Sequence, residues 1–204
     1  QDINTSTGIA TFHLSKLRLA LIYGDGSRAL VQTHALDQVS QSLVGMFYWG
    51  DVCIFSFLAF SLSLSRMSFI EKQKARWRMF HEYKKMKRWA AHCPVNFLHY
   101  QYLMEAELAR HSNKTEKAAS LYDKATSTAR QHEYIEYEAL ANQWAARFYL
   151  VQDKPEQAKH YLKQAHSCYD RWGAVSKVRQ LEEDYPGLFN NSPDMQAPLS
   201  DGAG

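Results

Sequence analysis

Apolar side chains recur every three or four positions from about residue 10 to residue 185, which is the spacing of helices with one buried face. Strand signals are missing, because no stretch alternates steadily between apolar and polar residues. The dipeptide closest to a hairpin signal, Asp25-Gly26, lies between two helical patterns and is interpreted as a turn between helices. The pattern therefore predicts an all-α protein.

A short polar turn followed by an alanine recurs four times along the chain. These alanines are Ala29, Ala75, Ala118 and Ala158, spaced 46, 43 and 40 residues apart. Small residues allow two helices to approach closely, and Ala106 and Ala146 stand where the preceding helix would meet two of these alanines. We therefore predict stacked antiparallel helix pairs, arranged as a right-handed solenoid like that of tetratricopeptide repeats. The period exceeds their 34 residues, so the helices or their connections must be longer.

The pattern divides the chain into four parts. Residues 1–9 are expected to be a flexible start, and residues 10–88 to form looser N-terminal helix pairs. Residues 89–186 should form the repeat core, closed by a capping helix that ends near Tyr185. Residues 187–204 contain too few apolar side chains to order themselves, so we expect a disordered tail or linker there.

The most apolar stretch runs from Leu43 to Leu64 and is interrupted by Gly50 and Asp51. The dense apolar run that remains, starting at Ile54, is about half of the ~20 residues that a bilayer requires. We therefore expect a buried helix and no membrane span. Three distant cysteines suggest neither a disulfide framework nor a zinc site, and a reducing, cytoplasmic setting fits them best. The chain starts at Gln1 without an initiator Met, so we expect a piece of a longer protein.

Positive charge is concentrated in one segment, although the formal net charge is only +3. Residues 66–92 carry nine Lys and Arg against two Glu. Such a helix can meet nucleic acid, an anionic membrane or an acidic partner, but most basic helices are solvated faces. Since no aromatic-glycine pattern of a nucleic-acid module is present, we predict no nucleic-acid binding and regard the segment as a contact surface for a protein.

Motifs for catalysis are weak or missing. The nine histidines lack the spacing of metal ligands, and residues 24–27 lack the lysine of a phosphate-binding loop. The pair His81-Glu82 resembles the phosphoacceptor of sensor kinases, but the Arg-Thr-Pro-Leu that follows in that motif is absent. Four glutamates that could be imagined as paired acids are interpreted as solvated helix faces: Glu105, Glu107, Glu136 and Glu138. We predict no catalytic, cofactor-binding or metal-binding residues.

Aromatic residues crowd residues 100–172, and most of them should form the core. Stacked helix pairs present a concave face lined by their first helices, where aromatic side chains often hold peptides. The candidate partner-binding residues are Tyr102, Arg110, Arg147 and Tyr149.

Short stretches from Trp89 to Pro186 carry a family resemblance. They include Trp89-Ala90-x-His92-Cys93-Pro94, Asn96-Phe97-Leu98-His99, Ala106-Glu107-x-x-Arg110, Tyr122-Asp123, Ala139-Leu140-Ala141-Asn142, Arg147-Phe148-Tyr149-Leu150, Tyr161-Leu162 and Trp172-Gly173-Ala174. These resemble the helical segment of multi-sensor hybrid histidine kinases that also carry serine/threonine kinase, ATPase and GAF domains.

The resemblance implies a non-catalytic coupling module between the ATPase and GAF portions of such a kinase. ATP binding and phosphotransfer would then reside elsewhere in the parent protein, and the partner would be a protein or another domain of the same chain. The alternative is a stand-alone helical adaptor or sensory domain that binds a peptide or a small ligand.

Overall fold

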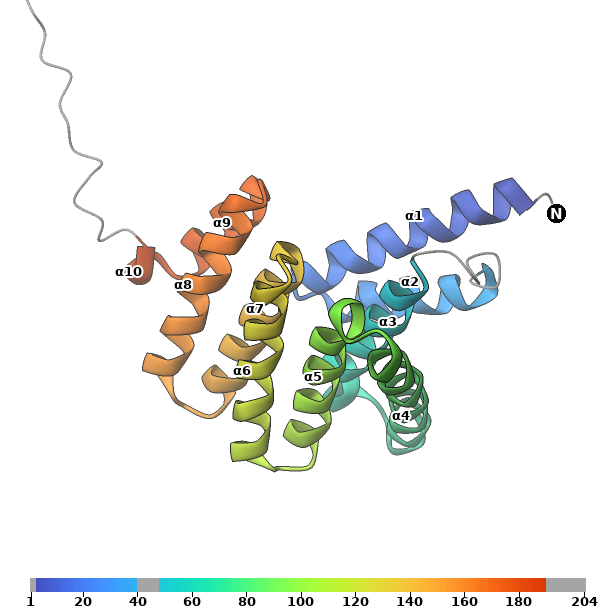
Figure 1. Ribbon diagram of the computed structural model, residues 1–204, viewed down its shortest axis with the longest axis horizontal. Coiled ribbons are helices and arrows are strands. Elements are labelled where there is room, and N and C mark those ends of the chain that lie inside the picture. The colour runs from blue at the N-terminus through green and yellow to red at the C-terminus, as the bar shows by residue number, and fades with distance from the viewer. Residues whose placement is uncertain (1–2, 40–47, 190–204) are drawn as a thin grey trace, which may run out of the picture.

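The computed structural model describes residues 3–39 and 48–189, and every regular element in these ranges is helical, which confirms the all-α prediction (Figure 1). The predicted tail from residue 190 and the start of the apolar stretch, residues 43–47, lie outside these ranges. The elements are α1 (Ile3–Ile22), α2 (Gly26–Val39), α3 (Trp49–Ser63), the 3₁₀ turn η2 (Leu64–Arg66), α4 (Phe69–His92), α5 (Pro94–His111), α6 (Thr115–Gln131), α7 (Ile135–Val151), α8 (Pro155–Arg171), α9 (Val175–Asp184) and α10 (Pro186–Phe189).

Helices that follow one another in sequence pack against one another, most extensively α1 with α2, α5 with α6, and α7 with α8 (Figure 1). The four alanines predicted to open second helices lie in α2, α4, α6 and α8, and all are buried: Ala29, Ala75, Ala118 and Ala158. Their predicted partners Ala106 and Ala146 are also buried. Small side chains therefore occupy the positions where paired helices approach most closely.

Five turns between helices share one backbone geometry. Each has a single left-handed residue at its centre: Gly24, Asn113, Glu133, Asp153 and Gly173. At Asn113, the N–H donates to the carbonyl of Arg110 (3.1 Å), and the next N–H donates to the carbonyl of Ala109 (2.9 Å). This pair of bonds satisfies carbonyls that the end of a helix leaves free.

The turns also set the repeat length. The last four left-handed positions are 20 residues apart, at 113, 133, 153 and 173, and α6, α7 and α8 each contain 17 residues. Between Ala118 and Ala158 the long period therefore comes from longer helices, since the connections there stay short.

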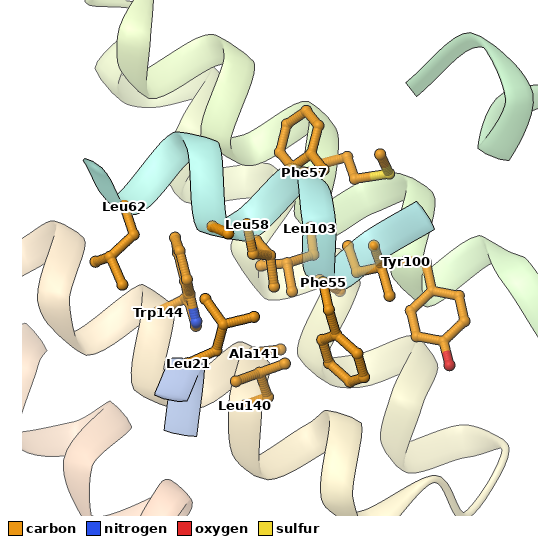
Figure 2. Packing of buried hydrophobic residues seen from close by; sticks show 14 of the residues in the cluster. Leu21, Phe55, Phe57, Leu58, Leu62, Tyr100, Leu103, Leu140, Ala141 and Trp144 are labelled. Atoms are coloured by element: carbon orange, nitrogen blue, oxygen red, sulfur yellow. The ribbon is translucent and has the colours of Figure 1, made fainter. Parts of the chain in front are cut away.

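Helix α3 is buried on all sides, with contacts to α1, α2, α4 and α5. Phe55 and Leu58 point toward the side of Leu21, Leu103 and Leu140 from the surrounding helices, whereas Phe57 points to the other side of α3 (Figure 2). A helix that is apolar around its whole circumference must be enclosed. The position of α3 confirms the buried helix that was predicted for the apolar run starting at Ile54. Among residues 3–39 and 48–189, no helix has the length and apolar character needed to cross a membrane.

The start of the fold differs from the prediction, because α1 begins at Ile3 and not near residue 10. The early residues are serine- and threonine-rich and have low helix propensity. Two of these side chains bond back to the preceding turn, Thr11 to the carbonyl of Thr7 and Ser15 to the carbonyl of Thr11, both at 2.9 Å. Ala10 is fully buried against the rest of the core, which anchors the helix.

The end of the described chain is also more ordered than predicted. Residues 187–189 belong to α10, and the ring of Phe189 stacks on His166 of α8 at a centroid distance of 4.4 Å. This contact offsets the cost of ordering a short segment rich in Pro and Gly. The predicted boundary between the N-terminal helix pairs and the repeat core, after residue 88, falls within α4. This helix begins with a capping box between Ser68 and Glu71.

The close approach of paired helices predicts a large effect of Ala106→Glu. A carboxylate at this fully buried position would overlap its neighbours and lack a partner, so we expect a loss of on the order of 3–5 kcal/mol in the free energy of unfolding. Urea denaturation monitored by circular dichroism measures this free energy of unfolding. The control Ala91→Glu lies on an exposed position of α4 and should change stability by less than about 0.5 kcal/mol. Equal stability of the two variants would contradict the packing of α5 on α6.

The left-handed turn at Glu133 predicts that Glu133→Gly stabilises the chain. Glu133 has φ of 60°, which is strained for a residue with a Cβ, so glycine should add about 0.5–1 kcal/mol. The matched change Glu116→Gly, in the right-handed first turn of α6, should instead cost about 1 kcal/mol. Melting temperatures that move in the same direction for both variants would refute the left-handed geometry.

Candidate functional site

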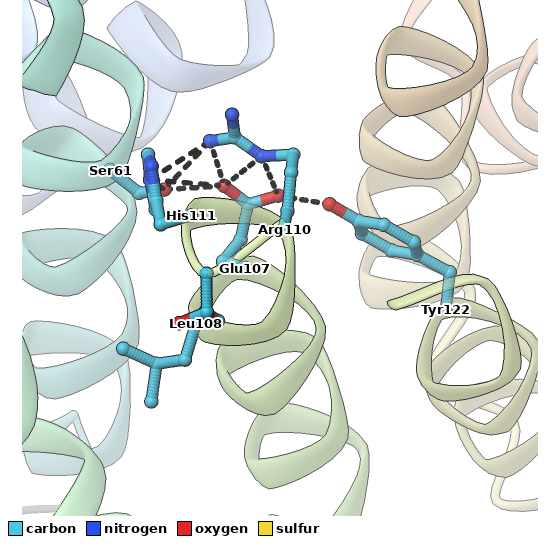
Figure 3. Close-up of polar contacts among 7 residues, drawn as sticks. Ser61, Glu107, Leu108, Arg110, His111 and Tyr122 are labelled. Carbon is cyan, nitrogen blue, oxygen red and sulfur yellow. Dashed lines mark hydrogen bonds and ion pairs between the residues drawn. The ribbon is translucent and has the colours of Figure 1, made fainter. Parts of the chain in front are cut away.

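A buried carboxylate lies at the junction of α3, α5 and α6. Glu107 of α5 is 1% exposed, and Arg110 donates to it from Nη2 at 2.6 Å and from Nε at 3.1 and 3.2 Å (Figure 3). The hydroxyls of Ser61 and Tyr122 also donate to its two oxygens. Charge and hydrogen-bonding capacity are thus satisfied within the protein.

The surroundings keep this group ionised. Burial alone would raise the pKa of Glu107, but the charge of Arg110 and the bonds from Arg110, Ser61 and Tyr122 hold that pKa below its ordinary value. The neighbouring His111 is different, because burial and the charge of Arg110 lower its pKa to about 4 and keep it neutral near pH 7. The cluster therefore contains one anion and one cation.

The interpretation of the four glutamates as solvated helix faces is wrong for Glu107 and Glu138, and Glu105 and Glu136 are half-buried. Glu107 and Glu138 are both buried, and Glu138 pairs with Arg130 at 2.6 Å. Glu136 pairs with Arg18, and Glu105 accepts hydrogen bonds from neighbouring side chains. The helical period alone could not predict these contacts, because each of the four glutamates contacts a residue on another helix. The Glu107–Arg110 pair, three residues apart on one helix, carried a local signal.

A cleft of about 420 Å³ opens beside this cluster. Its walls come from the end of α3, η2, the start of α4 and the last turns of α5 and α7. Four basic side chains line it: Lys72, Arg76, Arg110 and Arg147. Arg110 uses Nε and Nη2 within the cluster, whereas its Nη1 has no hydrogen bond to any residue that the structure describes.

The other three cations of the cleft are not neutralised. Lys72, Arg76 and Arg147 form no ion pair within the described ranges. Arg147 lies over the ring of Trp144 at 5.8 Å. Its pKa is lowered by desolvation and also by the charges of Arg110 and Arg66. The cleft is therefore a concentrated positive region with an apolar wall.

The four candidate partner-binding residues fall into two groups. Arg110 and Arg147 share the cleft. Tyr102 and Tyr149 face the second helix of their own pairs, Tyr102 beneath the ammonium of Lys124 at 5.8 Å and Tyr149 stacked on Tyr161 at 5.4 Å. The two tyrosines thus contribute to packing between paired helices and lie outside the cleft.

The basic segment 66–92 corresponds closely to α4, and it supplies Lys72 and Arg76 to the cleft. The helix also exposes large apolar side chains that the charge pattern did not predict: Phe69, Ile70, Trp77 and Phe80. Of these four, Trp77 lines an apolar groove of about 640 Å³ between α4, α2 and the end of α3.

His81 and Glu82 make separate contacts in this structure. His81 is exposed, stacks on Trp77 and bonds the carbonyl of Trp77 at 2.8 Å. Glu82 is buried and pairs with Lys85 at 3.2 Å and Arg78 at 3.7 Å, so its carboxylate does not serve His81. Across residues 3–39 and 48–189, no group of three His, Cys, Asp or Glu side chains is arranged to hold a metal ion.

The buried ion pair predicts a strong effect of Glu107→Gln. Removing the charge leaves Arg110 without its anion, so we expect a loss of about 3 kcal/mol in the free energy of unfolding. Glu156→Gln is the matched control, because it breaks an exposed pair of the same spacing with Lys159 and should cost less than about 0.5 kcal/mol. Equal losses in chemical denaturation would show that burial of the pair has no energetic consequence.

The same variant should change the response to acid. Because the pKa of Glu107 is lower in the folded chain than its ordinary value of 4.5, its stabilisation is present above that value and disappears as pH falls through the folded pKa. The stability difference between the unmodified chain and Glu107→Gln should therefore shrink below pH 4.5. Denaturation curves from pH 7 downward provide the measurement.

Comparison with known proteins adds a partial match. No protein-family model and no solved structure matches the chain. A stretch of 64 residues is 47% identical to Hybrid signal transduction histidine kinase G of Dictyostelium discoideum. It covers 31% of this chain, and the chain spans 2% of the length of that protein. Over this stretch the chain is therefore related to a hybrid histidine kinase, the class of protein that its sequence resembles.

Proposed function

We propose that this chain is a non-catalytic interaction and coupling module whose basic cleft binds an acidic segment of a protein. The observation that carries the proposal is the group of three unpaired cations, Lys72, Arg76 and Arg147, beside a fixed Arg110. Arranged positive charge attracts and orients an anionic partner.

Glu107 contributes by holding Arg110 in place. Its two oxygens are occupied by Arg110, Ser61 and Tyr122, so it has no free acceptor with which to take a proton from a substrate. The guanidinium of Arg110 is thereby oriented before a partner arrives, which lowers the entropic cost of binding. Its free Nη1 and the unpaired Arg147 are the groups that a carboxylate or phosphate would meet.

The architecture proposed for this module is a right-handed tetratricopeptide-like solenoid. Helices of equal length, turns of one geometry and buried alanines at each pair support it. Each repeated unit packs on the next, so the end of α5 and the end of α7 lie on one side and can bind a partner together.

The proposed setting is a multidomain signalling kinase, as the partial match to a hybrid histidine kinase suggests. The module would lie between the ATPase and GAF portions, and ATP binding and phosphotransfer would belong to other domains. The acidic segment would then come from another domain of the same protein or from a protein partner. All three cysteines are free, in keeping with the proposed reducing, cytoplasmic setting.

A stand-alone adaptor or sensory domain is the second candidate. It is favoured by a separate aromatic pocket of about 380 Å³ between α3, α5 and α7, a size suited to a small ligand.

The cleft predicts selective binding of acidic peptides. A fluorescein-labelled hexaglutamate peptide should bind the full chain, whereas its glutamine counterpart should not, and added salt should weaken binding. Arg147→Gln should reduce affinity by about fivefold, since it removes one charged contact at the rim. Fluorescence anisotropy measures these affinities.

Arg171→Gln is the matched control, because Arg171 is exposed at the end of α8 and does not line the cleft. The affinity of Arg171→Gln for hexaglutamate should stay within about twofold of the affinity of the unmodified chain. Equal losses for Arg147→Gln and Arg171→Gln would mean that the peptide responds to net charge and not to the cleft, and the proposal would fail.

A further inference from the structure

A second pocket, of about 380 Å³, lies at the opposite end of α3 from the basic cleft. The first turn of α3, the last turn of α4 and the first turns of α5 and α7 surround it. Aromatic rings form most of its wall: Trp49, Trp89, Phe97, Tyr100, Tyr134 and Tyr137. The two pockets share no lining residue.

The pocket contains a carboxylate without a cation. Asp51 accepts hydrogen bonds at Oδ1 from Tyr100 (2.7 Å) and Tyr137 (2.8 Å). Its Oδ2 has no hydrogen bond to any side chain or backbone group that the structure describes, and no Lys or Arg lines the pocket. The other acid of the wall, Glu136, is already paired with Arg18.

A buried histidine in the same wall is unsatisfied. His99 is 3% exposed, and within the described part of the chain neither ring nitrogen has a hydrogen-bond partner. Its ring lies 4.1 Å from that of Tyr100 and 4.8 Å from that of Tyr134, centroid to centroid. Burial, with a smaller effect of His132, lowers its pKa to about 3, so it adds no positive charge near pH 7. Buried polar groups without partners are rare in folded proteins.

We propose that this pocket binds a small organic ammonium compound. The positive group would lie against the aromatic faces, which attract cations through their π electrons, and would pair with Oδ2 of Asp51. The carboxylate and the lack of basic side chains disfavour an anion. The apolar rings disfavour a hydrated metal ion, which prefers several oxygen ligands. Neutral His99 contributes a polar wall that does not repel the cation.

Isothermal titration calorimetry on the full chain tests the proposal with choline, tetramethylammonium and phenethylammonium. The uncharged analogue of choline, 3,3-dimethylbutan-1-ol, has the same shape without the charge. We expect at least one ammonium compound to bind, and the alcohol to bind at least about tenfold more weakly than choline. Absence of heat for all three cations at concentrations up to about 10 mM would overturn the proposal.

Asp51→Asn removes the charge and keeps an oxygen that both tyrosine hydroxyls can reach. Affinity for the bound cation should fall by about tenfold or more. Asp123→Asn is the matched control, because Asp123 also accepts a hydroxyl, from Tyr161, but lies on α6 outside the pocket. It should leave affinity unchanged. Circular dichroism establishes that both variants keep their helices.

Trp89→Leu provides a second variant if Asp51→Asn unfolds. Trp89 is half-buried in the wall of the pocket and does not donate a hydrogen bond to Asp51. We expect it to weaken cation binding several-fold while leaving the alcohol unaffected. Equal affinity for choline and the alcohol, or unchanged affinity in Asp51→Asn, would refute a cation site. Hexaglutamate binding at the basic cleft is independent of all these outcomes, so the two proposals fail separately.

Discussion

Enclosure of α3 is the constraint on which the rest of the structure depends. Its 15 residues are almost all buried, so α1, α2, α4 and α5 must close around it. Packing this close leaves little room for side chains where α2 begins. A Cβ on Gly26 would lie 2.7 Å from the hydroxyl of Ser63, which instead donates to the carbonyl of Gly26. The two N-terminal pairs contain helices of 20, 14, 15 and 24 residues, whereas α6, α7 and α8 keep one length.

Polar groups of this enclosed helix lie beside both pockets. Near its C-terminus, Ser61 donates to Glu107, and the basic cleft opens beside that pair. At its N-terminus, Asp51 accepts from two tyrosines within the aromatic pocket. The helix dipole favours Asp51 in the first turn of α3, because anions are stabilised near the start of a helix. Two pockets of opposite charge character thus lie at the two ends of α3. The length of this helix separates them by about 20 Å.

Much of this fold could be predicted from sequence because it rests on local rules. The helical period, the alanines that let helices approach, and the apolar circumference of the segment around Phe57 each leave a pattern in neighbouring residues. The left-handed turn at Glu133 was not recognised, since a glutamate there gives no glycine signal. The ends of the chain were also misjudged, because α1 and α10 are ordered by contacts with distant helices.

By itself, the sequence determined the helical class, the order of the pairs and the residues that two helices bury between them, since periodicity specifies which face of a helix turns inward. The tertiary structure alone decided which side chains meet. Arg110 and Arg147 face one cleft while Tyr102 and Tyr149 do not, and Asp51 meets Tyr137, 86 residues away. Such pairs depend on how whole helices are placed against one another, and that placement follows from the core around α3 and not from any local pattern.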